Sequence, residues 1–135
     1  MRLRLLLITA LSSAALTMVV LAADAPSQKT ALVRFMKPTL IAGAAVMGPV
    51  VFEHDDARMA RGEPCTTVYA YDTKRKRPGN VLVEFMCLPQ ERPLAREFAA
   101  TCTRESPSGP DRLVEYQFAG NGEGHGVPFR PDRAH

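Results

Sequence analysis

The stretch from Cys65 to Cys87 constrains the fold of this chain most, because it has the pattern of a β-hairpin with a cysteine at each end. Residues 65–71 and 81–87 are rich in β-branched and aromatic side chains, which favour strands. Residues 72–80 between them are turn formers and charged residues. The pattern therefore predicts two antiparallel strands joined by a polar loop.

Folding this hairpin about Lys76 predicts its register and a disulfide. The cross-strand pairs are then Tyr71–Val81, Tyr69–Val83, Thr67–Phe85 and Cys65–Cys87. Side chains alternate along a strand, so all eight share one largely apolar face. Opposite Cα atoms in antiparallel strands lie about 4.5 or 5.5 Å apart, within the roughly 4.4 to 6.8 Å that a disulfide accepts. We therefore expect a Cys65–Cys87 disulfide, which leaves Cys102 as a free, buried, small hydrophobic residue.

The N-terminus has the pattern of a secretory signal peptide over residues 1–22. A basic start at 1–4 precedes an apolar run at 5–21, and small residues follow at 22–23. We expect cleavage after Ala22 and a secreted or periplasmic protein with no stable membrane span, a setting in which disulfides persist. An uncleaved anchor is the alternative, since the run is near the lower length limit for a span.

The rest of the chain predicts one all-β domain. A flexible segment at 23–30 precedes a β-domain at 31–119, and a Gly/Pro-rich tail covers 120–135. Short strand-like runs alternate with Gly/Pro turns, and no helical pattern extends beyond a turn or two. The fold class we expect is a small antiparallel sandwich or barrel of about six to eight short strands.

A second hairpin, folded about Ser108, supports this fold class. Its predicted pairs are Phe98–Phe118, Ala100–Tyr116 and Cys102–Val114. One face again becomes apolar, which agrees with the register.

The net charge of the chain does not indicate a particular class of binding partner. Loss of the leader removes two arginines, so 17 basic residues become 15 against 14 acidic ones, and the formal charge falls from +3 to about +1. This balance gives no indication of nucleic-acid binding. The four residues Lys74, Arg75, Lys76 and Arg77 form a basic hairpin tip that could contact anionic lipid or polysaccharide. For the protein as a whole, the partner we expect is an envelope protein or polysaccharide. The alternative is a solvated turn that resists aggregation.

His54 begins the polar cluster that most suggests a functional site. It is followed by Asp55, Asp56 and Arg58, where a strand enters a loop, and such loops often carry function. His54 could serve as a general base or a metal ligand. The alternative is a strand-end histidine followed by a helix cap, in which Asp55 or Asp56 caps one helical turn.

A metal site is the second functional hypothesis. His54, Met59 and His125 offer imidazole and thioether donors for copper or zinc, and Cys65 would add a thiolate. Cupredoxins are the obvious comparison, but here no histidine and methionine follow Cys65 at short spacing. A disulfide would also remove the Cys65 thiolate.

A complete catalytic set is missing from the sequence. There is no Gly-x-Ser-x-Gly elbow, and Ser106 and Ser108 lie in a Pro-rich turn. The glycine-rich stretch 120–126 opens no helix, so we expect a flexible loop and not a phosphate cradle. We assign no catalytic residue, and a small enzyme is the third hypothesis.

One stretch resembles a known group of proteins. Residues 38–43 followed by 48–52 are similar to a pattern in small exported bacterial β-proteins, in which x-x-I-x-G precedes a G-x-Y-x-F strand. This chain has Pro49-Val50 near the position of the tyrosine. The resemblance implies an envelope or secreted β-domain and no particular activity. A non-enzymatic exported β-domain that binds or scaffolds a component of the envelope is therefore the first hypothesis.

Overall fold

The computed structural model describes residues 27–130, and almost all of their regular structure is β. The elements are β1 (Gln28–Ile41), β2 (Ala44–Asp55), α1 (Asp56–Ala60), β3 (Thr66–Asp72), β4 (Arg77–Phe85), β5 (Leu88–Glu91), β6 (Ala99–Arg104), β7 (Asp111–Gln117) and β8 (Glu123–Gly126). The prediction of a β-rich fold with six to eight strands is confirmed. The expected signal peptide at 1–22 and the end of the tail at 131–135 lie outside the described residues.

The described strands form one mixed sheet of eight strands. Their order is β4-β3-β2-β1-β7-β8-β5, and β6 pairs with β7 beside this path. The pairing is largely antiparallel, as expected; the exception is β1 with β7, which run parallel at Thr39–Asp111 and Leu40–Arg112. Within residues 27–130, no helix is both long enough and apolar enough to cross a membrane.

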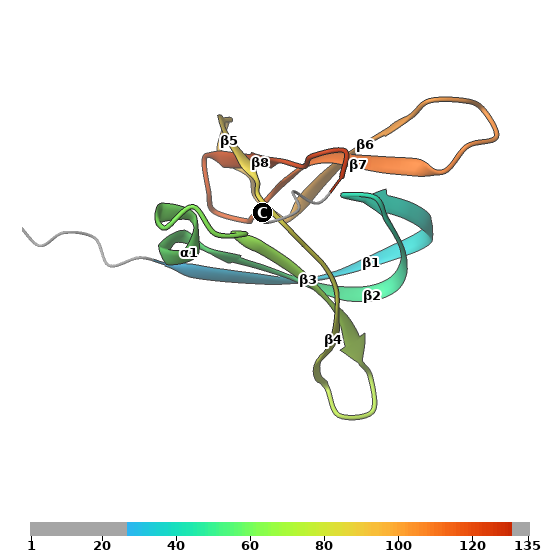
Figure 1. The fold of residues 1–135 in the computed structure, drawn as a ribbon, viewed down its shortest axis with the longest axis horizontal. Helices are drawn as coiled ribbons and strands as arrows, with labels where there is room; N and C mark the ends of the chain where they lie inside the picture. The colour runs from blue at the N-terminus through green and yellow to red at the C-terminus, as the bar shows by residue number, and fades with distance from the viewer. Residues whose placement is uncertain (1–26, 131–135) are drawn as a thin grey trace, which may run out of the picture.

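A bend in β1 lets this sheet enclose a core. The register with β2 shifts between Phe35 and Thr39, around Pro38, which has no N–H to donate to a ladder. β1 continues beyond Pro38 and pairs with β7. The sheet thereby places β6, β7 and β8 over β1, β2 and β3 (Figure 1).

Aromatic side chains fill the space between two parts of the sheet, one with β1, β2 and β3 and the other with β6, β7 and β8. The Phe52 ring on β2 lies 5.0 Å from the Tyr116 ring on β7 and 5.3 Å from the Phe98 ring, measured between centroids. The Tyr116 hydroxyl is buried and hydrogen-bonds to the Thr66 hydroxyl on β3. The core therefore joins β2 and β3 to β7, and a polar group inside it finds a partner.

The first hairpin exists, but its predicted register and disulfide are wrong. Thr66 pairs with Phe85 and Val68 with Val83, so these residues face the core. Next to the turn, Asp72 pairs with Arg77, three residues out of the predicted register, and bulges on either side of Tyr69 reduce this offset to one residue at Thr66–Phe85. On β3 the core face is therefore that of Thr66 and Val68, whereas Val83 and Phe85 on β4 keep the face predicted for them. Cys65 and Cys87 lie just outside the paired strands, and both are free, buried thiols.

The second hairpin is predicted correctly up to one bulge. Ala100 pairs with Tyr116, as expected, and the Phe98 and Phe118 rings are in contact, with centroids 5.6 Å apart. A register shift between Thr101 and Cys102 then places Cys102 opposite Leu113. Cys102 is free but exposed, so its expected burial is wrong. The reason is that β6 extends along β7 with every residue exposed, away from the core.

The glycine-rich stretch 120–126 contains a strand instead of the flexible loop we expected. β8 lies between β7 and β5, and His125 is opposite both Tyr116 and Pro89. The absence of a side chain at Gly124 matters here, because a Cβ would collide with the Glu115 carboxylate. β8 therefore carries His125 into the interior.

Candidate metal centre

His54 enters the core at the end of β2. Its side chain is fully buried, and the chain turns directly after it because Asp55 caps α1. The Asp55 carboxylate accepts hydrogen bonds from the backbone N–H groups of Ala57 and Arg58, at 2.9 and 3.1 Å. This confirms the predicted helical turn, with Asp55 as its cap.

Asp56, the first residue of α1, orients the His54 ring. Its Oδ1 lies 3.0 Å from His54 Nε2. The Ser27 hydroxyl, which donates to the same carboxylate, is the main cause that lowers the pKa of Asp56, so this group is an anion. A carboxylate that accepts a hydrogen bond from Nε2–H leaves Nδ1 with a free lone pair, which is the arrangement found around metal-bound histidines.

Cys87 and His125 complete a compact group with His54. Cys87 follows β4, and its Sγ lies 3.7 Å from His54 Nδ1 and 3.6 Å from His125 Nδ1. The two imidazole rings are 4.2 Å apart between centroids. Donor atoms of the three residues all lie within 4.8 Å of one another, and all three residues are buried.

These separations match those around a metal ion. In tetrahedral zinc sites, Zn–N is about 2.0 to 2.1 Å and Zn–S about 2.3 Å, which places a nitrogen and a sulfur ligand about 3.6 Å apart. The two observed nitrogen–sulfur distances are 3.6 and 3.7 Å. The two nitrogen–sulfur separations therefore fit one ion, and the donor atoms of all three residues lie within 4.8 Å of one another.

A second thiol adjoins this group. Cys65 is buried, and its Sγ accepts the backbone N–H of Cys87 at 3.1 Å. Its carbonyl accepts the N–H of Asp55 at 2.9 Å, which holds Cys65 beside the end of β2. The residue predicted to form a disulfide with Cys87 is thus a neighbouring thiol.

The pKa values of the two thiols are shifted in opposite directions. A hydrogen bond from the Cys87 thiol is the largest cause that lowers the pKa of Cys65; burial acts in the opposite direction, and His54 adds a smaller lowering effect. The same hydrogen bond, followed by burial, raises the pKa of Cys87. Of the two thiols, Cys65 is therefore the one that loses its proton more readily, and thiolates are the form of cysteine that binds metals.

His125 is a neutral imidazole with an unused nitrogen. Burial, followed by the charges of His54 and Lys29, lowers its pKa to about 4. Its Nε2 is buried without a hydrogen-bond partner, although buried polar atoms nearly always have one. Neutral imidazole is the form that ligates metals, so its burial and protonation state both suit a ligand.

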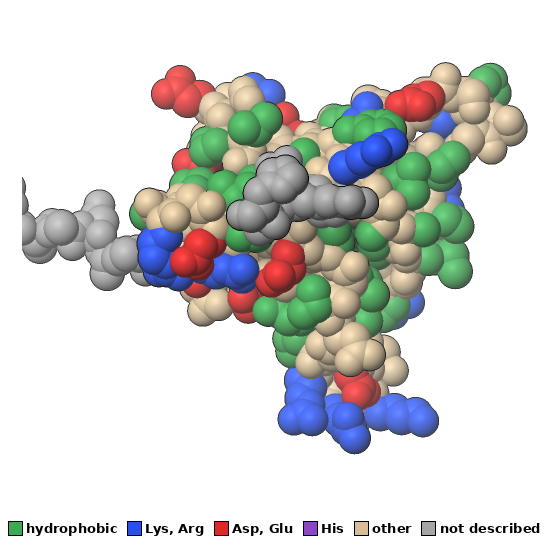
Figure 2. Space-filling model, in the orientation of Figure 1, with side chains coloured by type: hydrophobic (Ala, Val, Ile, Leu, Met, Phe, Trp, Pro, Cys, Tyr) green, Lys and Arg blue, Asp and Glu red, His purple; other side chains and the backbone are tan. Residues whose placement is uncertain are grey.

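The other residues predicted for function lie elsewhere. Met59 packs against the hydrophobic core, and the Arg58 guanidinium donates hydrogen bonds to Thr67 on β3 and Glu84 on β4. The four residues of the basic tip, 74–77, are exposed at the end of the β3–β4 hairpin, where basic side chains project from the molecule (Figure 2). Of the predicted metal ligands, the structure therefore brings together His54 and His125, and it adds Cys87.

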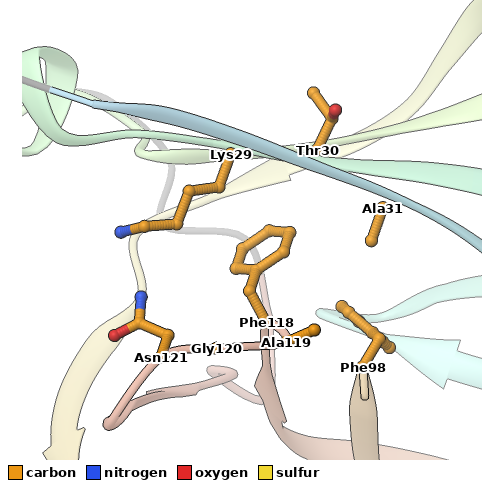
Figure 3. A pocket seen from close by; sticks show the side chains of 8 residues that line it. All are labelled: Lys29, Thr30, Ala31, Phe98, Phe118, Ala119, Gly120 and Asn121. Atoms are coloured by element: carbon orange, nitrogen blue, oxygen red, sulfur yellow. The ribbon is translucent and has the colours of Figure 1, made fainter. Parts of the chain in front are cut away.

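An open groove of about 570 Å³ lies next to the centre. Lys29 on β1 and Asn121 point towards its mouth, and the Phe98 and Phe118 rings form its wall (Figure 3). The Phe118 ring is 6.0 Å from the His125 ring, so it separates the groove from the buried donors.

Comparisons with protein-family models, with curated proteins and with solved structures found no match. The interpretation of this centre therefore rests on its geometry. Sequence reasoning missed Cys87 as a ligand because it assigned that thiol to a disulfide. The only available signal was its place at the end of a strand, next to a second cysteine in the predicted hairpin.

Proposed function

We propose that this protein binds a transition-metal ion through His54, Cys87 and His125. The observation that carries the proposal is the convergence of three buried donors whose nitrogen–sulfur distances, 3.6 and 3.7 Å, are those of a metal's ligands. This was the second hypothesis from the sequence, and the geometry of the donors now favours it over the first.

The donor set indicates the class of metal. Imidazole and thiolate ligands suit zinc and copper, whereas calcium and magnesium prefer oxygen ligands. Full burial of both histidines and near-complete burial of Cys87 favour a structural or carrier role over the turnover of a substrate.

The setting that we propose is the secretory pathway or the bacterial periplasm. The leader-like N-terminus and the resemblance to small exported β-proteins support this setting, and the β-rich sheet agrees with it. We further propose a sandwich-like arrangement, in which the bent β1 links two facing parts of one sheet. The exposed basic tip supports a second role, contact with an anionic envelope component.

Metal titration tests the proposal. The purified protein, reduced and freed of metal with a chelator, is titrated with Zn²⁺ or Cu⁺ against a competing chelator, and its stoichiometry is read by native mass spectrometry. We expect one ion per chain. Cys87→Ser and His125→Gln should weaken binding by more than the roughly 10–100-fold that loss of an outer-shell partner costs.

The matched control is Cys102→Ser, which changes an exposed thiol on β6 and should leave the affinity unchanged. A wild-type protein that binds neither ion, or a Cys87→Ser variant that binds as tightly as the wild type, would overturn the proposal.

A further inference from the structure

We propose that Cys65 is the fourth ligand, so that His54, Cys65, Cys87 and His125 form a closed tetrahedral site for a divalent ion of the zinc class. This inference rests on the proposed function, because it extends the same three-residue group by one donor and thereby selects the ion.

The position of Cys65 supports this role. The Cys65 Sγ accepts the N–H of Cys87 at 3.1 Å, so it lies against the backbone of a proposed ligand. The hydrogen bond from Asp55 N to Cys65 O ties the same residue to the strand end that carries His54. Two separate backbone contacts thus hold this sulfur beside two members of the group.

Burial supports it as well. Cys65 is 1% exposed, and its sulfur also has weak contacts with the Thr66 hydroxyl and the Phe85 carbonyl, both at 3.9 Å. Structural zinc sites are almost always four-coordinate, and two cysteines with two histidines is a common set. A buried second thiol beside a buried group of two imidazoles and one thiol provides that set.

Charge balance links the number of thiolates to the ion. A divalent ion with one thiolate and two neutral imidazoles would leave a net charge of about +1 in a buried site, and an uncompensated buried charge is costly. Two thiolates cancel the charge of a divalent ion. One thiolate cancels that of Cu⁺, so a three-ligand site would instead suit the monovalent ion.

The four ligands come from separated parts of the sheet. His54 ends β2, Cys65 precedes β3, Cys87 follows β4, and His125 lies in β8. β8, which carries His125, lies beyond β1 in the strand order, whereas His54 and Cys65 belong to the other part of the sheet, and Cys87 lies in the connection from β4 to β5. An ion held by all four would cross-link the two parts.

Cobalt spectroscopy counts the thiolates. Reduced, metal-free wild type, Cys65→Ser, Cys87→Ser and the control Cys102→Ser are each loaded anaerobically with Co²⁺. Thiolate-to-cobalt charge transfer gives a near-ultraviolet absorption that scales with the number of bound thiolates. We expect each of the first two substitutions to reduce this absorption to about half of the wild-type value, and Cys102→Ser to leave it unchanged.

The outcomes separate the two proposals. If the wild type binds no Co²⁺ and no Zn²⁺, the proposed metal site itself fails. If the wild type binds Co²⁺ and Cys65→Ser keeps the full charge-transfer intensity while Cys87→Ser loses all of it, only the role of Cys65 is overturned.

Zinc K-edge X-ray absorption of the loaded wild type keeps the test decisive should Cys65→Ser fail to fold. Two sulfur atoms at about 2.3 Å and two nitrogen atoms at about 2.0 to 2.1 Å are the expected shell. A shell with one sulfur would overturn the inference.

Discussion

The surroundings of His125 keep its imidazole buried and neutral, which is the form that binds metals. It lies in a four-residue strand, yet it is fully buried between the rings of His54 and Tyr116, whose centroids are 4.2 and 4.9 Å from its own. Burial disfavours the imidazolium, and the nearby positive charge of Lys29 adds to this effect. The charges of Cys65 and Asp56 act in the opposite direction without reversing the outcome.

The depressed pKa of His125 predicts an acid-sensitive metal-free protein. The unfolded chain takes up this proton near pH 6.5, but the folded protein does so only near pH 4, so the unfolded state binds more protons between these values. Stability should therefore be complete above about pH 6.5 and fall as the pH drops to about 4. The loss from this group is on the order of 3 kcal/mol.

Urea unfolding of the chelator-treated protein at pH 7, 5.5 and 4 measures this loss. Carboxylates also titrate in this range, so the comparison is with His125→Gln, whose stability should fall less steeply over the same interval. Equal slopes for the two proteins would contradict the prediction.

At the scale of elements, β8 depends on a glycine. The Glu115 carboxylate on β7 passes where a side chain of residue 124 would stand, and it is fixed by Arg92 through two hydrogen bonds of 2.7 and 2.8 Å. This ion pair joins β7 to the segment after β5, across β8. The strand can lie between its neighbours because it presents no side chain there.

Gly124→Ala should therefore displace β8. The new Cβ would collide with the Glu115 carboxylate, so the ion pair or the strand must move, at a cost of about 1–3 kcal/mol. Metal affinity should fall as well, because His125 is the next residue. Denaturant unfolding and metal titration measure the two effects.

Gly122→Ala is the matched control for that substitution. Its added Cβ would lie 3.4 Å from the nearest atom, the Arg92 carbonyl oxygen, and should have a much smaller effect. Equal effects of the two substitutions would contradict a role for the close approach at Gly124.

For the whole molecule, the proposed centre connects both parts of the sheet. Cys87 and His54 are separated by 33 residues, and Cys87 and His125 by 38, so an ion bound here closes long loops. The aromatic contacts of Phe52 with Tyr116 and Phe98 link the same two parts without metal. The fold therefore has an apolar connection and, beside it, a candidate metal connection.

Metal removal should accordingly lower the stability of the protein. A ligand that binds only the folded state at 100 times its Kd adds about 2.7 kcal/mol. We expect the melting temperature to rise with added Zn²⁺ and to return to its starting value with a chelator. Cys87→Ser should show no such rise, whereas Cys102→Ser should respond as the wild type does; a rise of equal size in Cys87→Ser would place the stabilising ion elsewhere.

The sequence by itself determined the β-rich class, the two hairpins and the Asp55 cap, because alternation, turn residues and capping act between near neighbours in the chain. Tertiary structure decided the rest. The position of the first turn and the bulges at Tyr69 and Cys102, which simple alternation does not reveal, set the two registers. Cys65 and Cys87 are therefore free, buried thiols, and Cys102 is exposed. The donor group formed only because β8 pairs between β7 and β5 and brings His125 to His54 and Cys87, a long-range pairing that no local pattern specifies.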